Sequence, residues 1–133
     1  RMKISSAAVL VPSNEVGAAV AEELRLAGLQ ATFFRGRDLD LKADVVKVMT
    51  LYSAKGLEFP VVAIAGFRAG SSRSRESFGD DEAYAEWLGN QRKVLYVGMT
   101  RAMRGLMVSV PSGCEHEAVC VLSGESWAME AGA

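Results

Sequence analysis

Residues Val48–Gly66, VMTLYSAKGLEFPVVAIAG, decide the fold because two apolar runs enclose a polar turn. Val45–Leu51 (VVKVMTL) has strand character, and Pro60–Ala65 (PVVAIA) is typical of a strand buried on both faces. Between them, Ser53–Glu58 predicts a turn or short helix around Gly56. Such a turn can direct backbone N–H groups and a lysine at an anionic ligand, and in open α/β sheets ligands gather at the carboxyl ends of strands. An ordinary structural turn remains the alternative.

Outward from this stretch, strands and helices alternate. Ala7–Val11 (AAVLV) predicts a buried strand, and Ser13 and Asn14 supply N-cap oxygens for the helix that follows. We place Gly28 at its C′ position. The apolar stripe of this helix comprises Val16, Ala19, Val20, Leu24 and Ala27. The other predicted elements are strands at Gln30–Phe34 and Leu106–Val110, a polar link at Arg35–Asp44, a mobile surface loop at Gly70–Asp81, and a helix marked by Tyr84, Trp87, Leu88, Gln91, Val94 and Leu95.

Strands that are hydrophobic on both faces and separated by helices predict an α/β fold, with a mostly parallel sheet flanked by helices. The length of 133 residues, half of them hydrophobic, suits a single core. We expect one domain over residues 1–111. Residues 112–133 are expected to be a tail, either a short helix around Trp127 or disordered.

Composition narrows the functional class. The net charge of −1 gives no electrostatic support for a basic nucleic-acid-binding arm, so any DNA contact must use a few local donors. Two cysteines are too few for a secreted disulfide scaffold, and no apolar run reaches about 18 residues, so a cytoplasmic location is expected. Cys114, His116 and Cys120 lack a fourth metal ligand and fit no familiar spacing, so no metal site is predicted.

Two segments resemble motifs of the UvrD/Rep/PcrA-like superfamily 1 DNA helicases. Met49–Pro60 is similar to motif V, usually MTLHSAKGLEFP, with Tyr52 in place of the histidine. Gln91–Leu106 (QRKVLYVGMTRAMRGL) is similar to motif VI, usually E-E-R-R-L-x-Y-V-G-x-T-R-A, with Asn90 and Gln91 in place of the acidic pair. Their order identifies the chain as similar to the C-terminal RecA-like domain of these helicases. The resemblance therefore implies a P-loop NTPase-like fold without the P-loop itself.

The resemblance also implies a role for each matched residue. Arg101 would be the catalytic arginine finger, because a guanidinium is planar, always charged and able to bond two phosphate oxygens. Gly56 and Glu58 would join it in binding the nucleotide, with Glu58 at a ribose hydroxyl. The residues implied for single-stranded DNA are Thr50, Tyr52, Ser53 and Lys55.

Structural roles stay open beside these functional ones. A helix-end position is the alternative for Glu58 and Arg101, a plain strand residue is the alternative for Thr50, and support of the turn is the alternative for Ser53. The residues expected in the core of the motif VI helix are Tyr96, Trp87 and Leu95.

The sequence contains no G-x-x-x-x-G-K-[ST] loop and no acidic pair after an apolar strand. We therefore expect ATP and Mg²⁺ to be bound mainly by an N-terminal RecA-like domain of the same polypeptide, and this chain to be inactive alone. The function implied is the C-terminal motor domain of an ATP-dependent DNA helicase or translocase, with single-stranded DNA as partner and no membrane contact. The alternative is a non-catalytic RecA-like interaction or regulatory domain.

Overall fold

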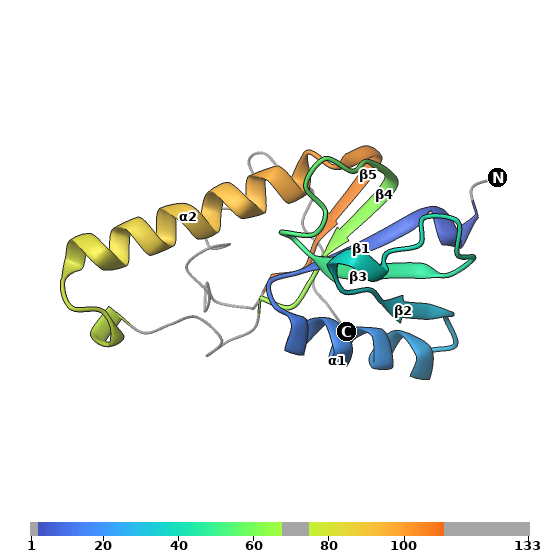
Figure 1. The fold of residues 1–133 in the computed structure, drawn as a ribbon, viewed down its shortest axis with the longest axis horizontal. Coiled ribbons are helices and arrows are strands. Elements are labelled where there is room, and N and C mark those ends of the chain that lie inside the picture. Colours follow the sequence, from blue (N-terminus) through green and yellow to red (C-terminus); the bar gives the residue numbers. More distant parts are fainter. Residues whose placement is uncertain (1–2, 68–74, 111–133) are drawn as a thin grey trace. The chain divides into compact units, whose positions relative to one another are not determined.

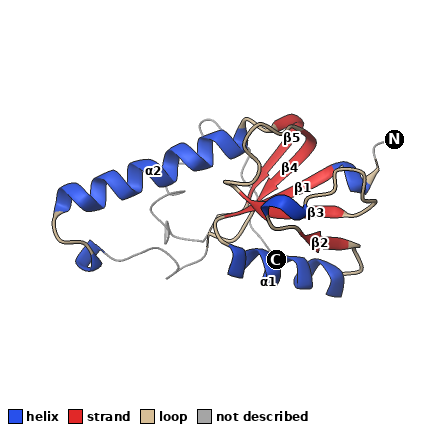
Figure 2. Ribbon diagram, viewed as in Figure 1, coloured by secondary structure: helices blue, strands red, loops and turns tan. Residues whose placement is uncertain are grey.

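The computed structural model describes residues 3–67 and 75–110. The described residues divide into two units, the first with residues 3–66 and 93–109, and the second with residues 67, 75–92 and 110. The first unit contains a five-stranded sheet in the order β2-β3-β1-β4-β5, with every neighbouring pair parallel (Figures 1 and 2). The strands are β1 (Ala7–Val11), β2 (Ala31–Phe33), β3 (Val46–Thr50), β4 (Phe59–Ile64) and β5 (Ala102–Val108). The predicted parallel α/β fold is confirmed.

Two α-helices accompany these strands, α1 (Asn14–Leu26) and α2 (Asp81–Met99). Short 3₁₀ helices lie at Ile4–Ser6, Gly36–Asp38 and Arg75–Ser77. The last of these, and the start of α2 at Asp81, fall inside the predicted surface loop, whose residues 70–74 lie outside the described ranges. Within those ranges, no helix has the length and apolar character needed to cross a bilayer.

Helix α1 begins and ends where the sequence predicts. The Ser13 hydroxyl accepts a hydrogen bond from the Val16 amide (3.4 Å), and Gly28 follows the C-cap Ala27 with φ 94°. The predicted stripe is partly wrong, because Ala19 and Ala27 are exposed. The residues of α1 that are buried are Gly17, Val20 and Ala21.

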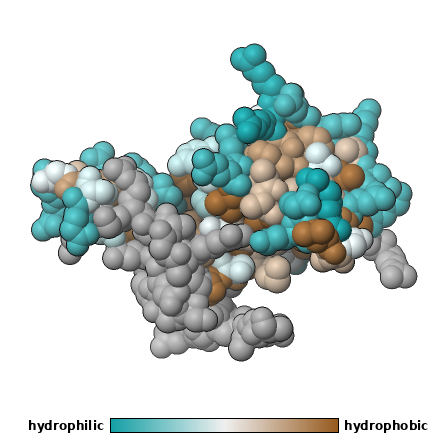
Figure 3. All heavy atoms as spheres, turned by 90° about the horizontal axis from the view of Figure 1, so that it is seen from below, coloured by the Kyte–Doolittle hydropathy of each residue, from teal (hydrophilic) through white to brown (hydrophobic). Residues whose placement is uncertain are grey.

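One face of the sheet packs against α1. The buried cluster there comprises Val9, Val11, Val20, Ala21, Ala31, Val46 and Val48. Figure 3, which views the molecule from below, shows hydrophobic residues interspersed with hydrophilic ones on this side. Strand alternation sends the neighbouring side chains of β1, such as Ala8 and Leu10, to the opposite face.

On the opposite face, the end of α2 meets residues 51–58, which connect β3 to β4. Gly98 of α2 lies against Leu51, with Leu10 and Ile64 beside it, so that a side chain at this position would collide with Leu51. Leu51 is itself buried. The closeness of α2 to the β3–β4 connection therefore depends on a glycine.

The last strand begins at Ala102, earlier than the predicted Leu106. Its start is set by pairing with β4, since Phe59 is in register with Ala102 and the Phe59 amide donates to the Arg101 carbonyl (2.9 Å). Hydrophobic pattern alone does not reveal such a pairing, because the partner is distant in the sequence.

Strand β3 carries one buried charge, Lys47, which is 3% exposed. Its ammonium donates to the carbonyl oxygens of Ser5 (3.0 Å), Ala43 (2.9 Å) and Val45 (3.3 Å). Each N–H of the ammonium thus has an acceptor, which is the condition for burying a charge at tolerable cost.

In the second unit, three aromatic rings pack together. The ring centroids of Phe78 and Tyr84, and of Phe78 and Trp87, are 5.4 Å apart, and those of Tyr84 and Trp87 are 6.0 Å apart. Tyr84 and Trp87 are thus held by aromatic contacts near the start of α2.

Substitution of Gly98 tests the packing of α2 on the β3–β4 connection. Gly98→Ala should lower the free energy of unfolding, because overpacking costs about 1–3 kcal/mol. Gly89→Ala is the matched control in the same helix, since nothing lies within 4 Å of its Cβ position. It should raise stability by about 0.5–1 kcal/mol. Urea unfolding followed by circular dichroism measures both, and equal midpoints would show that Gly98 is not sterically required.

Candidate functional site

The connection of residues 51–58 runs from one end of the parallel strands to the other. We call these two sides of the sheet the carboxyl edge and the amino edge, after the strand ends that lie there. It leaves the carboxyl end of β3 at Thr50, which is in register with Val11, and reaches the amino end of β4 at Phe59. Because β1 lies between β3 and β4, the connection crosses β1. The prediction that this turn lies at the carboxyl ends of the strands is therefore wrong for Glu58, which lies at the amino edge.

At the carboxyl edge, the Thr50 hydroxyl holds the start of the connection. It accepts a hydrogen bond from the Ser53 amide (3.2 Å), and the hydroxyl oxygens of Thr50 and Ser53 are 3.0 Å apart. The Thr50 carbonyl also accepts from the Ala54 amide (3.3 Å). Thr50 and Ser53 are thus brought together, in an arrangement that resembles an N-cap. Ser53 supports the turn, as its structural alternative anticipates.

The middle of the connection presents one side to the core and the other to solvent. Leu51 and Ala54 are buried, whereas Tyr52 is 60% exposed and Lys55 is exposed. Gly56 has φ 82°, a conformation that side-chain-bearing residues rarely adopt, so the turn after Lys55 favours glycine. The two exposed side chains are free to meet a ligand.

A hollow of about 250 Å³ lies between this connection and α2. It is lined by Leu51, Tyr52, Lys55, Lys93, Val94 and Val97. The three α2 residues, Lys93, Val94 and Val97, were not among the predicted site residues. Their spacing of three and four places them on one helix face, but it does not show what that face meets.

At the amino edge, Glu58 and Arg101 immediately precede two residues that pair in adjacent strands. Phe59 and Ala102 are in register, so the backbones of Glu58 and Arg101 are neighbours although the residues are distant in sequence. Neighbouring strands lie about 4.8 Å apart. In the part of the chain that the structure describes, the two side chains form no ion pair with each other.

The half-buried Arg101 side chain lies on the end of α2. Its Nε donates to the Val97 carbonyl (3.2 Å), and Nη2 donates to the Thr100 hydroxyl (3.2 Å), which in turn donates to the Val97 carbonyl (2.7 Å). A cation at a helix C-terminus is also favoured by the helix dipole. The helix-end alternative therefore describes the observed conformation of Arg101. Sequence reasoning did not anticipate the contact with Thr100.

Of the three expected core positions of α2, one is wrong, one is half-buried and one is confirmed. Tyr96 is 65% exposed, because it lies on the side of α2 away from the buried Leu95. Trp87 is half-buried. Leu95 is buried as predicted.

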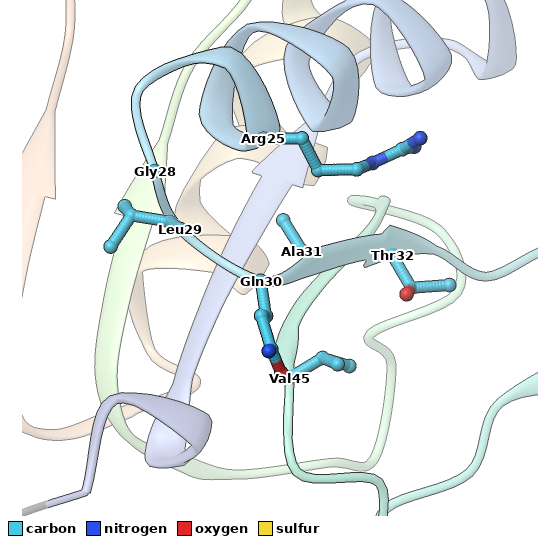
Figure 4. A pocket seen from close by; sticks show the side chains of 7 residues that line it. All are labelled: Arg25, Gly28, Leu29, Gln30, Ala31, Thr32 and Val45. Atoms are coloured by element: carbon cyan, nitrogen blue, oxygen red, sulfur yellow. The ribbon is translucent and has the colours of Figure 1, made fainter.

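A second hollow, of about 410 Å³, lies at the end of α1 beside β2 (Figure 4). It is lined by Arg25, Gly28, Leu29, Gln30, Ala31, Thr32 and Val45, none of which is a predicted site residue. The Arg25 guanidinium is already paired with the Glu22 carboxylate (Nη1 to Oε2, 3.3 Å).

Metal binding is not indicated among the residues that the structure describes. No group of three or more His, Cys, Asp or Glu side chains there is arranged to hold an ion. Cys114, His116 and Cys120 lie outside the described residues, as does the predicted tail at residues 112–133.

The sequence matches a known protein family over most of its length. The model of the UvrD-like helicase C-terminal domain matches residues 12–113. DNA helicase II of Escherichia coli is 43% identical over 70 residues, which are 53% of this chain and 9% of that protein. The ATP-dependent DNA helicase UvrD1 of Mycobacterium leprae is 43% identical over 67 residues, 50% of this chain and 8% of that protein. The matched stretch therefore spans only about a tenth of these relatives.

A solved structure shares the fold. The C-terminal domain of a possible DNA helicase from Lactobacillus plantarum WCFS1 superimposes with a TM-score of 0.53 and 24% identity. The match covers 79% of this chain and 56% of that chain.

The contact between Thr50 and Ser53 gives a stability prediction. Thr50→Val should lower the free energy of unfolding by about 0.5–2 kcal/mol, the usual cost of losing a cap, whereas Thr50→Ser should retain most of it. Thr32→Val is the control, because Thr32 is exposed and forms no side-chain hydrogen bond. Denaturant titration measures all three variants. A Thr50→Val midpoint equal to that of Thr32→Val would rule out the capping role.

Proposed function

Because the chain belongs to the UvrD-like helicase C-terminal domain family, we propose that it is the second motor domain of an ATP-dependent helicase or translocase that moves on single-stranded DNA. The observation that supports the proposal is the pairing of Phe59 with Ala102, which makes the backbones of Glu58 and Arg101 neighbours at the amino ends of β4 and β5. Acidic and basic side chains are thereby available together on one potential wall of a nucleotide site.

Arg101 would act on the γ-phosphate of ATP. Its present contacts are to the neutral oxygens of Val97 and Thr100. A phosphate would instead offer negatively charged oxygens, to which a guanidinium can donate two parallel hydrogen bonds. The same guanidinium would stabilise charge on the phosphoryl group during transfer. Glu58 would accept from a ribose hydroxyl, and Gly56 would let the backbone approach the nucleotide.

This chain supplies only one side of such a site. The phosphate-binding loop, the Mg²⁺ ligands and the base that orients water would come from an N-terminal RecA-like domain of the same polypeptide. Mg²⁺ would neutralise charge on the β- and γ-phosphates. Alone, the chain would bind ATP weakly and would not hydrolyse it.

Single-stranded DNA would bind toward the other edge, at Thr50, Tyr52, Ser53 and Lys55. The connection of residues 51–58 spans the distance between the two edges, which is roughly 15–20 Å for strands of this length. Because Leu51 and Ala54 anchor it in the core, it would move with the sheet as one body. Closure of the ATP cleft would thus shift the DNA-binding residues, coupling hydrolysis to movement.

Tyr52, Asn90 and Gln91 differ from the residues that are usual in the helicase motifs. These differences favour one alternative, a domain that retains the fold as an interaction or regulatory module and does not take part in ATP hydrolysis. The two functions differ in whether single-stranded DNA stimulates ATP hydrolysis.

Replacement of Arg101 tests the motor function in the polypeptide that carries both RecA-like domains. Arg101→Ala should reduce DNA-stimulated ATP hydrolysis by about 10³–10⁵-fold, the usual worth of an arginine finger, while leaving ATP binding largely intact. Arg104→Ala is the matched control, because Arg104 is exposed and has no side-chain partner in the described structure. Steady-state turnover and titration with a fluorescent ATP analogue measure the two quantities.

The outcomes separate the two functions. Unchanged turnover in Arg101→Ala would remove the finger assignment. An unsubstituted polypeptide that hydrolyses no ATP in the presence of single-stranded DNA would favour the non-catalytic module.

A further inference from the structure

The hollow between the β3–β4 connection and α2 joins two segments that lie far apart in the sequence. We infer that it seats one nucleotide of a single strand, with the base against Tyr52 and the valines of α2, and its phosphates between Lys55 and Lys93. The inference rests on the proposed function, because it takes single-stranded DNA as the bound polymer. It extends the strand-binding surface onto α2, where the matched motif residues place no strand contact.

The walls of the hollow suit a flat, apolar ligand. Leu51 is 2% exposed and belongs to the core, and Val94 and Val97 lie on one side of α2. Tyr52 is mostly exposed and offers a ring on which a base can stack. Stacking on an aromatic side chain tolerates any sequence because every base has a π-face. A motor that moves along a strand needs this kind of contact.

The charges around the hollow select an anion. Lys55 and Lys93 are exposed, and within the described structure neither ammonium has a hydrogen bond or ion pair. No acidic residue is among the lining side chains. The chain as a whole carries a net charge of −1, so these two cations mark a local site and not a general basic surface. A nucleotide presents both an apolar face and a negative charge, and therefore matches both properties.

The position of the hollow extends the strand path proposed above. Tyr52 lies between Thr50 and Ser53, whose hydroxyl groups meet at the carboxyl edge of β3. On the other side, Val97 lines the hollow, and its carbonyl oxygen accepts the hydrogen bond from Arg101 Nε. A rise of about 1.5 Å per residue puts Lys93 roughly two turns from the end of α2. One helix thus connects the hollow to the resting position of Arg101.

Photocrosslinking in the full polypeptide tests the inference. An oligothymidylate carrying one 5-iododeoxyuridine should crosslink to Tyr52, as identified by mass spectrometry of the peptides. Tyr52→Ala should weaken binding by about 5- to 150-fold, and Tyr52→Phe should bind almost normally because it keeps the ring.

Salt dependence tests the contact with phosphate. Affinity falls as the salt concentration rises, so log affinity plotted against log salt concentration has a negative slope. Lys93→Ala should reduce the magnitude of this slope by about 0.7, the value for one phosphate contact on a single strand. Lys42→Ala is the control, because Lys42 is an exposed lysine that does not line the hollow. Fluorescence anisotropy over a range of salt concentrations measures both slopes.

Three results would overturn the inference, and they are distinguishable from failure of the proposed function. Crosslinks at other residues, with an unchanged slope for Lys93→Ala, would place the strand elsewhere and leave the motor function standing. Protection of Lys93 from acylation before DNA is added would show that protein covers the hollow. Absence of any binding to the oligonucleotide would contradict both the hollow and the proposed function.

Discussion

Parallel pairing constrains this structure more than any other interaction. A strand parallel to its predecessor cannot follow a tight hairpin, so the chain must return across the sheet before it pairs again. Between β3 and β4 it does so with residues 51–58 alone, which is short for such a crossover. The connection must therefore lie flat on the sheet, and this explains why Leu51 and Ala54 are buried while Tyr52 and Lys55 face solvent. The candidate site follows from that geometry.

The two motif segments are also one packed body. Leu51 fills the space that the missing side chain of Gly98 leaves open, so the connection and the last residues of α2, from Lys93 on, are packed together. The same contact brings the lysines of both segments around a common hollow. At the far end, the start of β5 beside β4 fixes the backbone of Arg101, while its side chain donates to the Val97 carbonyl and the Thr100 hydroxyl.

Local patterns in the sequence were sufficient for elements whose signals are local. The strand at Ala7–Val11 and the N-cap at Ser13 are found as predicted, because apolar runs and capping residues act within a few positions. The start of β5, the exposure of Tyr96 and the proximity of Glu58 to Arg101 depend instead on partners far along the chain. Family resemblance supplied the candidate residues, but it did not reveal that they occupy opposite edges of the sheet. Lys93 was missed because a helical face shows its spacing without showing its neighbour.

Lys47 has a consequence for the fidelity of folding. A shift of β3 by one residue would exchange its two faces and turn this ammonium toward the valines beneath α1. There it would lose the carbonyl oxygens of Ser5 and Ala43, and an unpaired buried ion costs several kcal/mol. Without Lys47, the apolar residues of β3 would discriminate much less between the native register and a shifted one. Lys47 thus acts as a register marker, which makes the misaligned sheet unstable and leaves a single alignment for the strand.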